Sequence, residues 1–279
     1  MKTILVPVEQ HDSARFALDL AATLAERFDS VIEGFALQVP PLAGIGWDPA
    51  SVAMIHESDW DHRQAIAKAR QLFRDTMAEH GLHDGAEAAS DASASRAIWN
   101  EAAMAGEGFL GGYGRAFDLT VVGQPRAGGS SITTLEAALF DSGGPILLVP
   151  PKRFDSVGET VVIAWNGSSE TARTIALAMP LIRKAKRVVV LSDDGGIGDR
   201  PAGSLIQRRL ERNGIAAELK LLPDKRIRSG EAILSEAAAL GCDLLVKGAY
   251  TQSRLRQMIF GGATNHILAN AEMPVILAH

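Results

Sequence analysis

The sequence has a single cysteine, Cys242, and it lacks both long apolar runs and an excess of positive charge. One cysteine excludes an internal disulfide and is compatible with a reducing compartment. No apolar run reaches the ~18 residues of a membrane-spanning helix, so no membrane partner is expected. The formal net charge of −5 provides no field to neutralise phosphates, which argues against a nucleic-acid partner.

The first residues, MKTILVPVEQHDSARF, have one charge beside a short apolar run and no small-residue cleavage site. This pattern is not that of a secretory signal peptide, and we expect a cytoplasmic protein. The chain has 279 residues, of which 47% are hydrophobic and 22% charged. It is therefore long enough for one large domain or for two domains of about 140 residues each.

Three pairs of similar segments occur in the same order along the chain. The pairs are 2–21 with 160–179, 117–124 with 242–249, and 143–150 with 271–279. Both segments of the first pair have an apolar run, an acid or amide, a polar stretch, and then apolar positions at helical spacing. Three ordered pairs predict an internal duplication.

Each copy alternates apolar runs with helical stretches. Runs such as ILVPV and RVVVLS are continuous and rich in Val, Ile and Leu, as is typical of parallel strands covered on both faces. Helices are predicted over 12–28, 60–82, 204–214 and 230–241, and the last three end at glycines. The alternation predicts two doubly wound α/β domains.

The boundary is predicted at 150–159, which contains prolines and charges without periodicity. We expect domains at 1–151 and 158–279, packed as an intramolecular pseudo-dimer with equivalent last strands at the seam; a further homodimer is left open. The first domain also has a Pro/Gly-rich insertion at 38–60. It is interpreted as a lid, a partner surface or a plain surface loop.

Ligands of open α/β sheets bind beyond the carboxyl ends of the strands, at the switch point in strand order. Two positions in each copy meet this requirement. One is the residue after the first strand, Glu9 or Asn166. The other is the loop after the fourth strand, which starts at Gly123 or Gly248.

At these positions the chain resembles the universal stress proteins, in a tandem two-domain form, over nearly its whole length. Nucleotide-binding members have Gly-x-x-Gly, nine residues, then Gly and Ser or Thr. Here Gly248, Thr251, Gly261 and Gly262 keep that spacing, but Thr251 replaces the second glycine and Gly262 replaces the hydroxyl residue. The resemblance implies a five-stranded parallel sheet of order 3-2-1-4-5 in each half. It also implies ATP or a related adenine nucleotide as ligand, with or without Mg²⁺, and contact of Asn166 with the nucleoside.

The chemistry of the loop supports the same site without the family name. Gly248 is expected to let the strand end turn sharply. Gly261 and Gly262 would bare backbone N–H groups to a phosphate, and the helix that follows offers unpaired N–H groups and a positive dipole end. Other expected contacts of the loop come from Ser253, Ala263 and Thr264. The alternative is that the glycines only punctuate a strand and a helix.

Two further residues have alternative interpretations. Asn166 can read an adenine edge or a ribose through its amide, or it can open the next helix as a turn residue together with Ser168. Trp165 is either a core residue or one wall of the pocket.

The first half is a poorer candidate. Gly128 and Gly129 come too soon after Gly123 for the family spacing, and Ser131 or Thr133 is expected to cap the following helix. We therefore predict a degenerate first site. The seven histidines form no recognised ligand set, so no metal site is predicted, and Cys242 is expected to be a small core residue.

The favoured interpretation is a cytoplasmic adenine-nucleotide-binding stress-response protein. The second domain would hold the ligand, and occupancy would alter a surface read by unknown protein clients. No base–nucleophile pair is visible, so no catalytic residue is predicted, although weak ATP hydrolysis stays an alternative. The other alternative is a scaffold, or a binder of some other small ligand, without a nucleotide.

Overall fold

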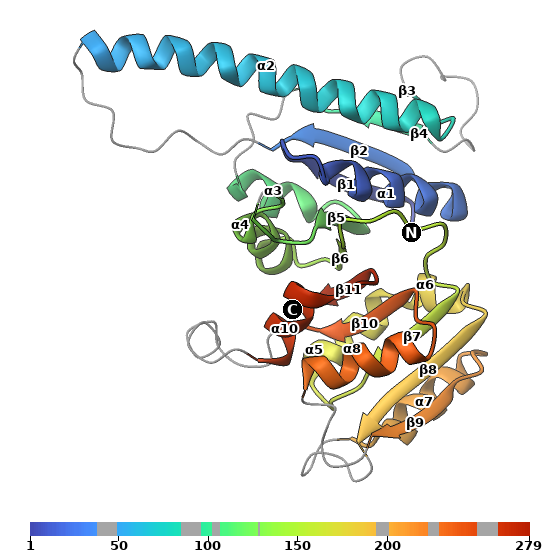
Figure 1. Ribbon diagram of the computed structural model, residues 1–279. Helices are drawn as coiled ribbons and strands as arrows, with labels where there is room; N and C mark the ends of the chain where they lie inside the picture. Colours follow the sequence, from blue (N-terminus) through green and yellow to red (C-terminus); the bar gives the residue numbers. More distant parts are fainter. Residues whose placement is uncertain are drawn as a thin grey trace.

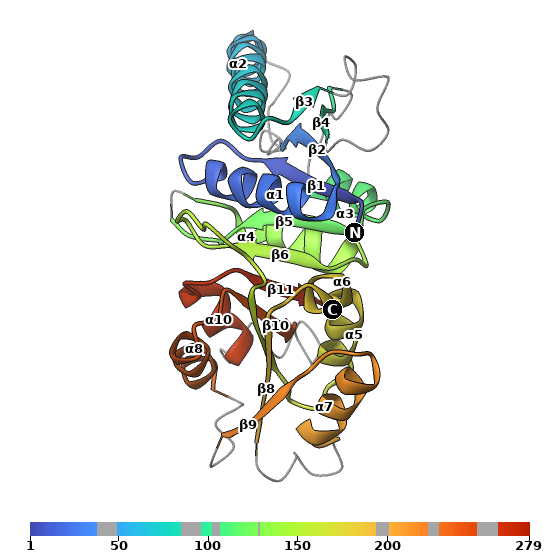
Figure 2. The ribbon, with the colours of Figure 1, turned by 90° about the vertical axis from the view of Figure 1, so that its right-hand side faces the viewer.

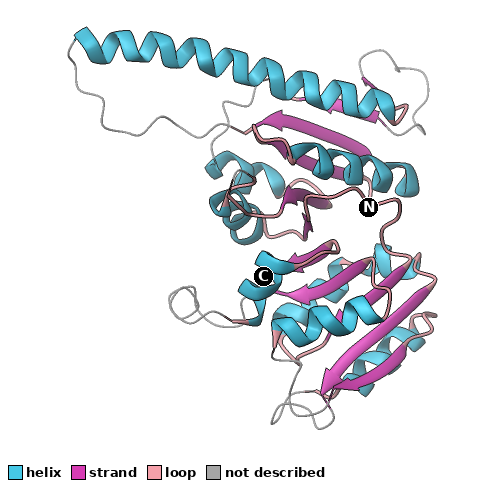
Figure 3. Cartoon of the chain, viewed as in Figure 1, coloured by secondary structure: helices cyan, strands magenta, loops and turns pink. Residues whose placement is uncertain are grey.

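The computed structural model describes residues 1–37, 49–84, 96–101, 107–127, 129–193, 201–222, 229–249 and 262–279. In these ranges strands and helices alternate, and the strands form one long sheet with helices on both faces (Figures 1 and 3). No helix in the described ranges has the length and apolarity that crossing a membrane requires.

The elements of the two halves follow one another along the chain. The first half contains β1 (Thr3–Val8), α1 (Ala14–Phe28), β2 (Val31–Ala36), α2 (Pro49–Glu79), β3 (His83–Asp84), β4 (Arg96–Trp99), α3 (Glu107–Gly114), β5 (Leu119–Gly123), α4 (Ile132–Glu136), the π-helical turn η1 (Ala137–Asp141) and β6 (Ile146–Val149). The second half contains β7 (Thr160–Ala164), α5 (Ser169–Leu177), α6 (Met179–Arg183), β8 (Arg187–Asp193), α7 (Gly203–Arg212), β9 (Glu218–Leu222), α8 (Gly230–Ala239), β10 (Leu244–Gly248), α10 (Ala263–Asn270) and β11 (Val275–Ala278).

The sheet has eleven strands in the order β3-β4-β2-β1-β5-β6-β11-β10-β7-β8-β9. Within each half all the named strand pairs are parallel. Taken along the chain, the second half has the order 3-2-1-4-5, and the first half has the same order with the short β3 added at its edge. The predicted α/β class and strand order are confirmed. The two sheets, however, are joined into one.

The seam between the halves is an antiparallel pair of the two last strands. β6 pairs with β11, and Leu147 lies opposite Ile276. Both residues are 1% exposed or less. Figure 2 shows the two strands side by side at the centre of the molecule. The expectation that equivalent last strands meet is confirmed, and the join leaves neither edge free to pair with another chain.

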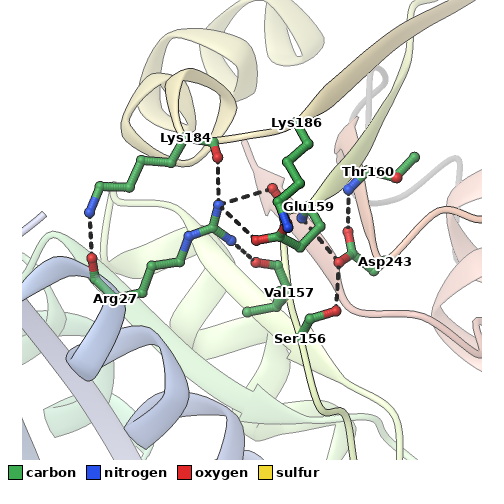
Figure 4. Close-up of polar contacts among 9 residues, drawn as sticks. Arg27, Ser156, Val157, Glu159, Thr160, Lys184, Lys186 and Asp243 are labelled. Carbon is green, nitrogen blue, oxygen red and sulfur yellow. Dashed lines mark hydrogen bonds and ion pairs between the residues drawn. The ribbon is translucent and has the colours of Figure 1, made fainter.

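A polar cluster adds to the seam at the linker. The guanidinium of Arg27, at the end of α1, donates hydrogen bonds to the carbonyl oxygens of Val157, Gly158 and Lys184 (Figure 4). The ammonium of Lys184 in turn donates to the carbonyl oxygen of Arg27. These contacts fix the end of α1 against the linker and α6 of the other half.

The duplication is also visible in the hydrogen bonds of two aspartates. Asp118 accepts from the backbone N–H of Lys2 at 2.5 Å and of Thr3 at 3.1 Å. Asp243 accepts from the backbone N–H of Glu159 at 3.0 Å and of Thr160 at 2.8 Å. Each carboxylate thus holds the start of the first strand of its own half.

The sheet separates two apolar clusters, each of which lies under one layer of helices. The apolar cluster on one face of the sheet includes residues of α1, α2, α5, α6 and α7. The cluster on the other face includes residues of α3, α4, η1, α8 and α10. This division decides which helix ends surround a side chain that leaves a strand on a given face.

Most element boundaries agree with expectation. Gly81, Gly214 and Gly241 have φ of +69°, +78° and +70°, so these glycines end their helices in the left-handed conformation. The insertion is different. α2 starts at Pro49, so residues 49–60 are helical and not a loop, because Pro is favourable at a helix start and no glycine or proline follows it within the helix. Residues 38–48 lie outside the described part.

Candidate functional site

The carboxyl ends of β7 and β10 are joined by one threonine of α5. The backbone N–H of Gly248 donates to Thr171 Oγ1 at 3.3 Å, and Thr171 Oγ1 donates to Asn166 Oδ1 at 2.8 Å. The structure therefore links Asn166 to Gly248 through Thr171. Sequence reasoning missed Thr171; the signal was the Ser-x-x-Thr pattern that starts at Ser168, directly after the strand.

Gly248 is required here for steric reasons. A Cβ at this position would lie 2.3 Å from the backbone nitrogen of Thr171 and 2.6 Å from the carbonyl carbon of Glu170. Its φ is not among the positive glycine values, so the expected sharp turn does not explain the residue. The physical reason is the close approach of the first turn of α5 to the strand end.

Asn166 takes the turn role that was one of its two interpretations. Its Oδ1 also accepts from the backbone N–H of Ser168 at 3.2 Å. Ser168 is the N-cap of α5, and its hydroxyl accepts from the N–H of Thr171 at 3.2 Å. The amide oxygen of Asn166 therefore orders the start of α5, while contact with a nucleoside stays a prediction.

Trp165 lies in the core. The side chain is 3% exposed and packs in the cluster on the face of α5 and α7, and its indole N–H donates to the carbonyl oxygen of Pro201 at 2.8 Å. Of the two interpretations of Trp165, core residue or pocket wall, the first therefore describes its position. α10 lies on the opposite face of the sheet.

In the part of the chain that the structure describes, no side chain caps the start of α10. Gly262 has an extended backbone, with φ of −90° and ψ of 173°, and makes no side-chain cap. A Cβ on Gly262 would meet nothing within 4 Å. Ala263 begins the helix, and Thr264 is buried with 8% exposure. The predicted site residues Thr251, Ser253 and Gly261 lie outside the described residues.

A second helix starts directly beside α10. A Cβ on Gly230, the first residue of α8, would lie 2.6 Å from the carbonyl oxygen of Ala263. The two helix N-termini are therefore in contact, and both carry the positive ends of helix dipoles. Negative charge is favoured at such a place.

Lys247 is a buried cation at the end of β10, and sequence reasoning missed it. Its side chain is 5% exposed, and Nζ donates to the carbonyl oxygen of Gly248 at 3.2 Å. Burial lowers the pKa of Lys247 to about 8, although Glu170 acts in the opposite direction. The available signal was a lysine inside the otherwise apolar run of residues 244–248.

In the first half, the carboxylate of Glu9 lies at the start of α4, the helix equivalent to α10. Glu9 Oε1 accepts from the N–H of Ser131 at 3.0 Å and from the hydroxyl of Thr134 at 2.8 Å, and Oε2 accepts from the hydroxyl of Ser130. Ser131 caps α4 by accepting from the N–H of Thr133, as was expected for one of these two residues. The start of α4 thus already has an anion.

The hydrogen bonds set the ionisation of Glu9. Burial alone would raise the pKa of Glu9, but hydrogen bonds from neighbouring groups outweigh it and lower the pKa below the ordinary value. The donors are His11, Ser130, Ser131 and Thr134. The carboxylate is therefore charged at neutral pH, and an external phosphate would meet like charge at this position.

A cavity of about 500 Å³ lies elsewhere, between α2 and the carboxyl ends of β2 and β4. Its lining residues are Ala36, Arg63, Ile66, Ala67, Arg70, Gln71, Arg74, Trp99, Asn100 and Glu101. None of the predicted site residues lines it. This cavity is therefore separate from the candidate site, which lies at the ends of β7 and β10 and at the start of α10.

Comparison with known proteins agrees with the architecture. The family model described as the universal stress protein family matches residues 225–279. No curated protein matches the chain in sequence. A universal stress protein from Archaeoglobus fulgidus DSM 4304 has a similar structure, with a TM-score of 0.67 at 14% identity, over 99% of this chain and 95% of its own.

Two other solved structures are similar to different extents. A putative universal stress protein from Pseudomonas aeruginosa UCBPP-PA14 gives a TM-score of 0.52 at 13% identity, over 100% of this chain and 93% of its own. A universal stress protein in complex with cAMP gives a TM-score of 0.34 at 16% identity, over 43% of this chain and 97% of its own. At these identities the likeness concerns the fold. The chain therefore matches the universal stress protein family model over residues 225–279 and has the fold of these universal stress proteins along its full length.

Proposed function

We propose that the second half, residues 158–279, binds ATP or a related adenine nucleotide, and that the protein acts in the cytoplasmic stress response. The nucleoside would lie near Asn166 at the end of β7. The phosphates would lie at the first turn of α10, against the backbone of Gly262 and Ala263. Thr251, Ser253, Gly261 and Thr264 complete the proposed set, and Mg²⁺ would accompany the phosphates where it is needed.

The observation that carries the proposal is the difference between two equivalent helix starts. In the first half, the helix start is capped by Ser131 and neutralised by Glu9. In the second half, the N-cap is Gly262, without a side-chain cap, and Asn166 turns to α5 instead. Such a helix start is a favourable site for a phosphate. The first half, 1–151, would then be the degenerate partner of the second, and occupancy would be read by protein clients.

A charge placed at the helix start tests the proposal. In Gly262→Asp, the carboxylate caps α10 favourably but repels a phosphate, so we expect a folded protein with at least 10-fold weaker ATP binding by calorimetry. Ser131→Asp is the matched control, because it adds the same charge at the equivalent N-cap of α4. It should leave ATP binding unchanged.

Native mass spectrometry of protein purified without added ligand is the complementary measurement. A mass increment of an adenine nucleotide supports the proposal. A bare mass, together with no heat from millimolar ATP, with or without Mg²⁺, would overturn it in favour of a scaffold. A turnover assay on the same material separates passive binding from hydrolysis.

A further inference from the structure

Lys247 is in an unusual position for a lysine. It is 5% exposed, and its neighbours in β10 are apolar residues with no exposed surface. Burying an ammonium group costs several kcal/mol unless an opposite charge or several acceptors accompany it. The described ion pairs include none to Lys247, and its hydrogen bond to the carbonyl oxygen of Gly248 engages one of three N–H groups.

The direction of the side chain follows from the alternation along β10. Leu245 and Ala249 belong to the cluster that contains Ile233 of α8 and Ile267 of α10. Successive side chains of a strand point to opposite faces, so Lys247 leaves the strand on this same face. Because Nζ lies 3.2 Å from the oxygen of Gly248, the amine remains at the carboxyl end of the strand.

Two helix N-termini lie on the face of the sheet to which Lys247 points. The contact of Gly230 with Ala263 places the N-termini of α8 and α10 on this face and at this end of the sheet. Glu170 is the charged group that raises the pKa of Lys247, and burial more than offsets it. The carboxylates on these elements are Glu170 of α5 and Glu231 in the first turn of α8, beside the ammonium and the two helix N-termini.

The internal duplication supplies a natural comparison. The residue equivalent to Lys247 is Val122, which is 1% exposed and lies directly before Gly123. In that half, Glu9 supplies the anion at the helix start. The half with an internal carboxylate has an apolar residue at this position, whereas the half in which the described residues provide no side-chain cap for α10 has a lysine.

We infer that Lys247 is the cationic contact for an anionic group of the ligand, so that the second half takes a phosphate-bearing nucleotide in preference to an uncharged nucleoside. The inference deepens the proposed function and rests on the same site. An anion beside Nζ would also satisfy the remaining N–H groups of the amine.

The test compares ATP, adenosine and inorganic tripolyphosphate by calorimetry on wild-type protein and on Lys247→Met, which keeps the length of the side chain without its charge. We expect at least 10-fold weaker binding of ATP and tripolyphosphate by the variant and less than a 2-fold change for adenosine. Val122→Met in the first half is the matched control and should bind all three as the wild type does.

The pH dependence provides a second readout. Wild-type affinity for tripolyphosphate should fall as the pH rises above about 8, because the amine loses its charge, and Lys247→Met should lose this dependence. The other titratable or charged groups on the packed elements are Glu170 and Arg173 of α5, Glu231 and Glu236 of α8, His266 of α10 and His279 after β11. They are retained in the variant, so any dependence that they cause remains.

The outcomes separate the two ideas. If wild type binds ATP and Lys247→Met binds ATP and tripolyphosphate equally well, the inference is wrong and the proposed function stands. If wild type binds tripolyphosphate through Lys247 without any gain from the adenosine moiety, the anion contact stands and the adenine nucleotide does not. If wild type binds none of the three ligands, both are overturned.

Discussion

The guanidinium of Arg27 donates a 2.7 Å hydrogen bond to the carbonyl oxygen of Lys184, 157 residues further along the chain. Arg27 ends a helix of the first half, and Lys184 follows α6 of the second half. An ion pair at 3.6 Å joins Arg27 to Glu159 in the linker segment, and Lys186 holds the same carboxylate (Figure 4). The Arg27 side chain thus connects the end of α1 to the linker and to the end of α6, beside the β6–β11 seam.

Removal of the Arg27 side chain is expected to destabilise the protein. Arg27→Ala deletes three charge-assisted hydrogen bonds from a side chain that is 18% exposed, so we expect a loss of about 2–4 kcal/mol in the free energy of unfolding. Urea unfolding followed by circular dichroism measures it. Arg183→Ala in α6 is the control, because its contact with Asn213 stays within the second half; about 0.5 kcal/mol or less is expected. Equal midpoints for Arg27→Ala and wild type would contradict this role of Arg27.

The buried carboxylate of Glu9 should make stability depend on pH. Because the folded pKa of Glu9 lies below its ordinary value of 4.5, its contribution is complete above that value and is lost as the pH falls through the folded pKa. Glu9→Gln should therefore lower the free energy of unfolding by about 1–3 kcal/mol at pH 7 and by much less once the pH has fallen below the folded pKa of Glu9. Urea titrations at a series of pH values measure this difference.

The control for Glu9 is Glu211→Gln, which removes an exposed carboxylate of α7. It should have little effect at either pH. If the destabilisation by Glu9→Gln stayed constant across the whole acidic range in which the protein folds, packing and not the charge of Glu9 would explain its role.

Much of the fold could be predicted from the sequence, because parallel strands buried on both faces appear as continuous apolar runs. The runs at β1, β7 and β10 are of this kind. β4 was missed because it lies near the sheet edge and is only partly buried. The first turns of α2 were taken for loop, since nearby prolines and glycines dominate the composition of residues 38–60.

The site was predictable only in part. Asn166 and Gly248 were predicted because any residue at the carboxyl end of a strand near the switch point is a candidate. The roles of Thr171 and Glu9 depend on which side chain turns across to a neighbouring segment. Sequence spacing does not contain that information, because Glu9 and Thr134 meet although 125 residues separate them.

The thiol of Cys242 should react slowly with disulfide reagents in the native protein. Burial raises the pKa of the Cys242 thiol to about 12, so only about one thiol in ten thousand is ionised at pH 8, and the thiolate is the reactive form. We expect labelling by a disulfide reagent at pH 8 to be at least 100-fold slower in buffer than in 6 M urea. Cys242 is the only cysteine of the sequence, so the signal is unambiguous, and Cys242→Ser gives the blank. Cys242 is half-buried against the core, and fast labelling in buffer would show that its surroundings do not raise the pKa of the thiol.

Substitution of Gly248 tests the close approach of α5 to β10. In Gly248→Ala, the new Cβ would lie 2.3 Å from the backbone nitrogen of Thr171, and the backbone must shift to relieve this. We expect a loss of about 2–4 kcal/mol in the free energy of unfolding, together with weaker ATP binding.

The equivalent substitution in the first half should be milder. In Gly123→Ala, the nearest atom is the side-chain Cβ of Ser130 at 3.1 Å, which can move by a few tenths of an ångström, so we expect a loss of no more than about 1.5 kcal/mol. Gly112→Ala in α3, where a Cβ meets nothing within 4 Å, should be neutral or stabilising by up to about 1 kcal/mol. Urea unfolding of the three variants orders them. If Gly123→Ala lowered the free energy of unfolding as much as Gly248→Ala does, the close approach of α5 to Gly248 would not explain the effect of the Gly248 substitution.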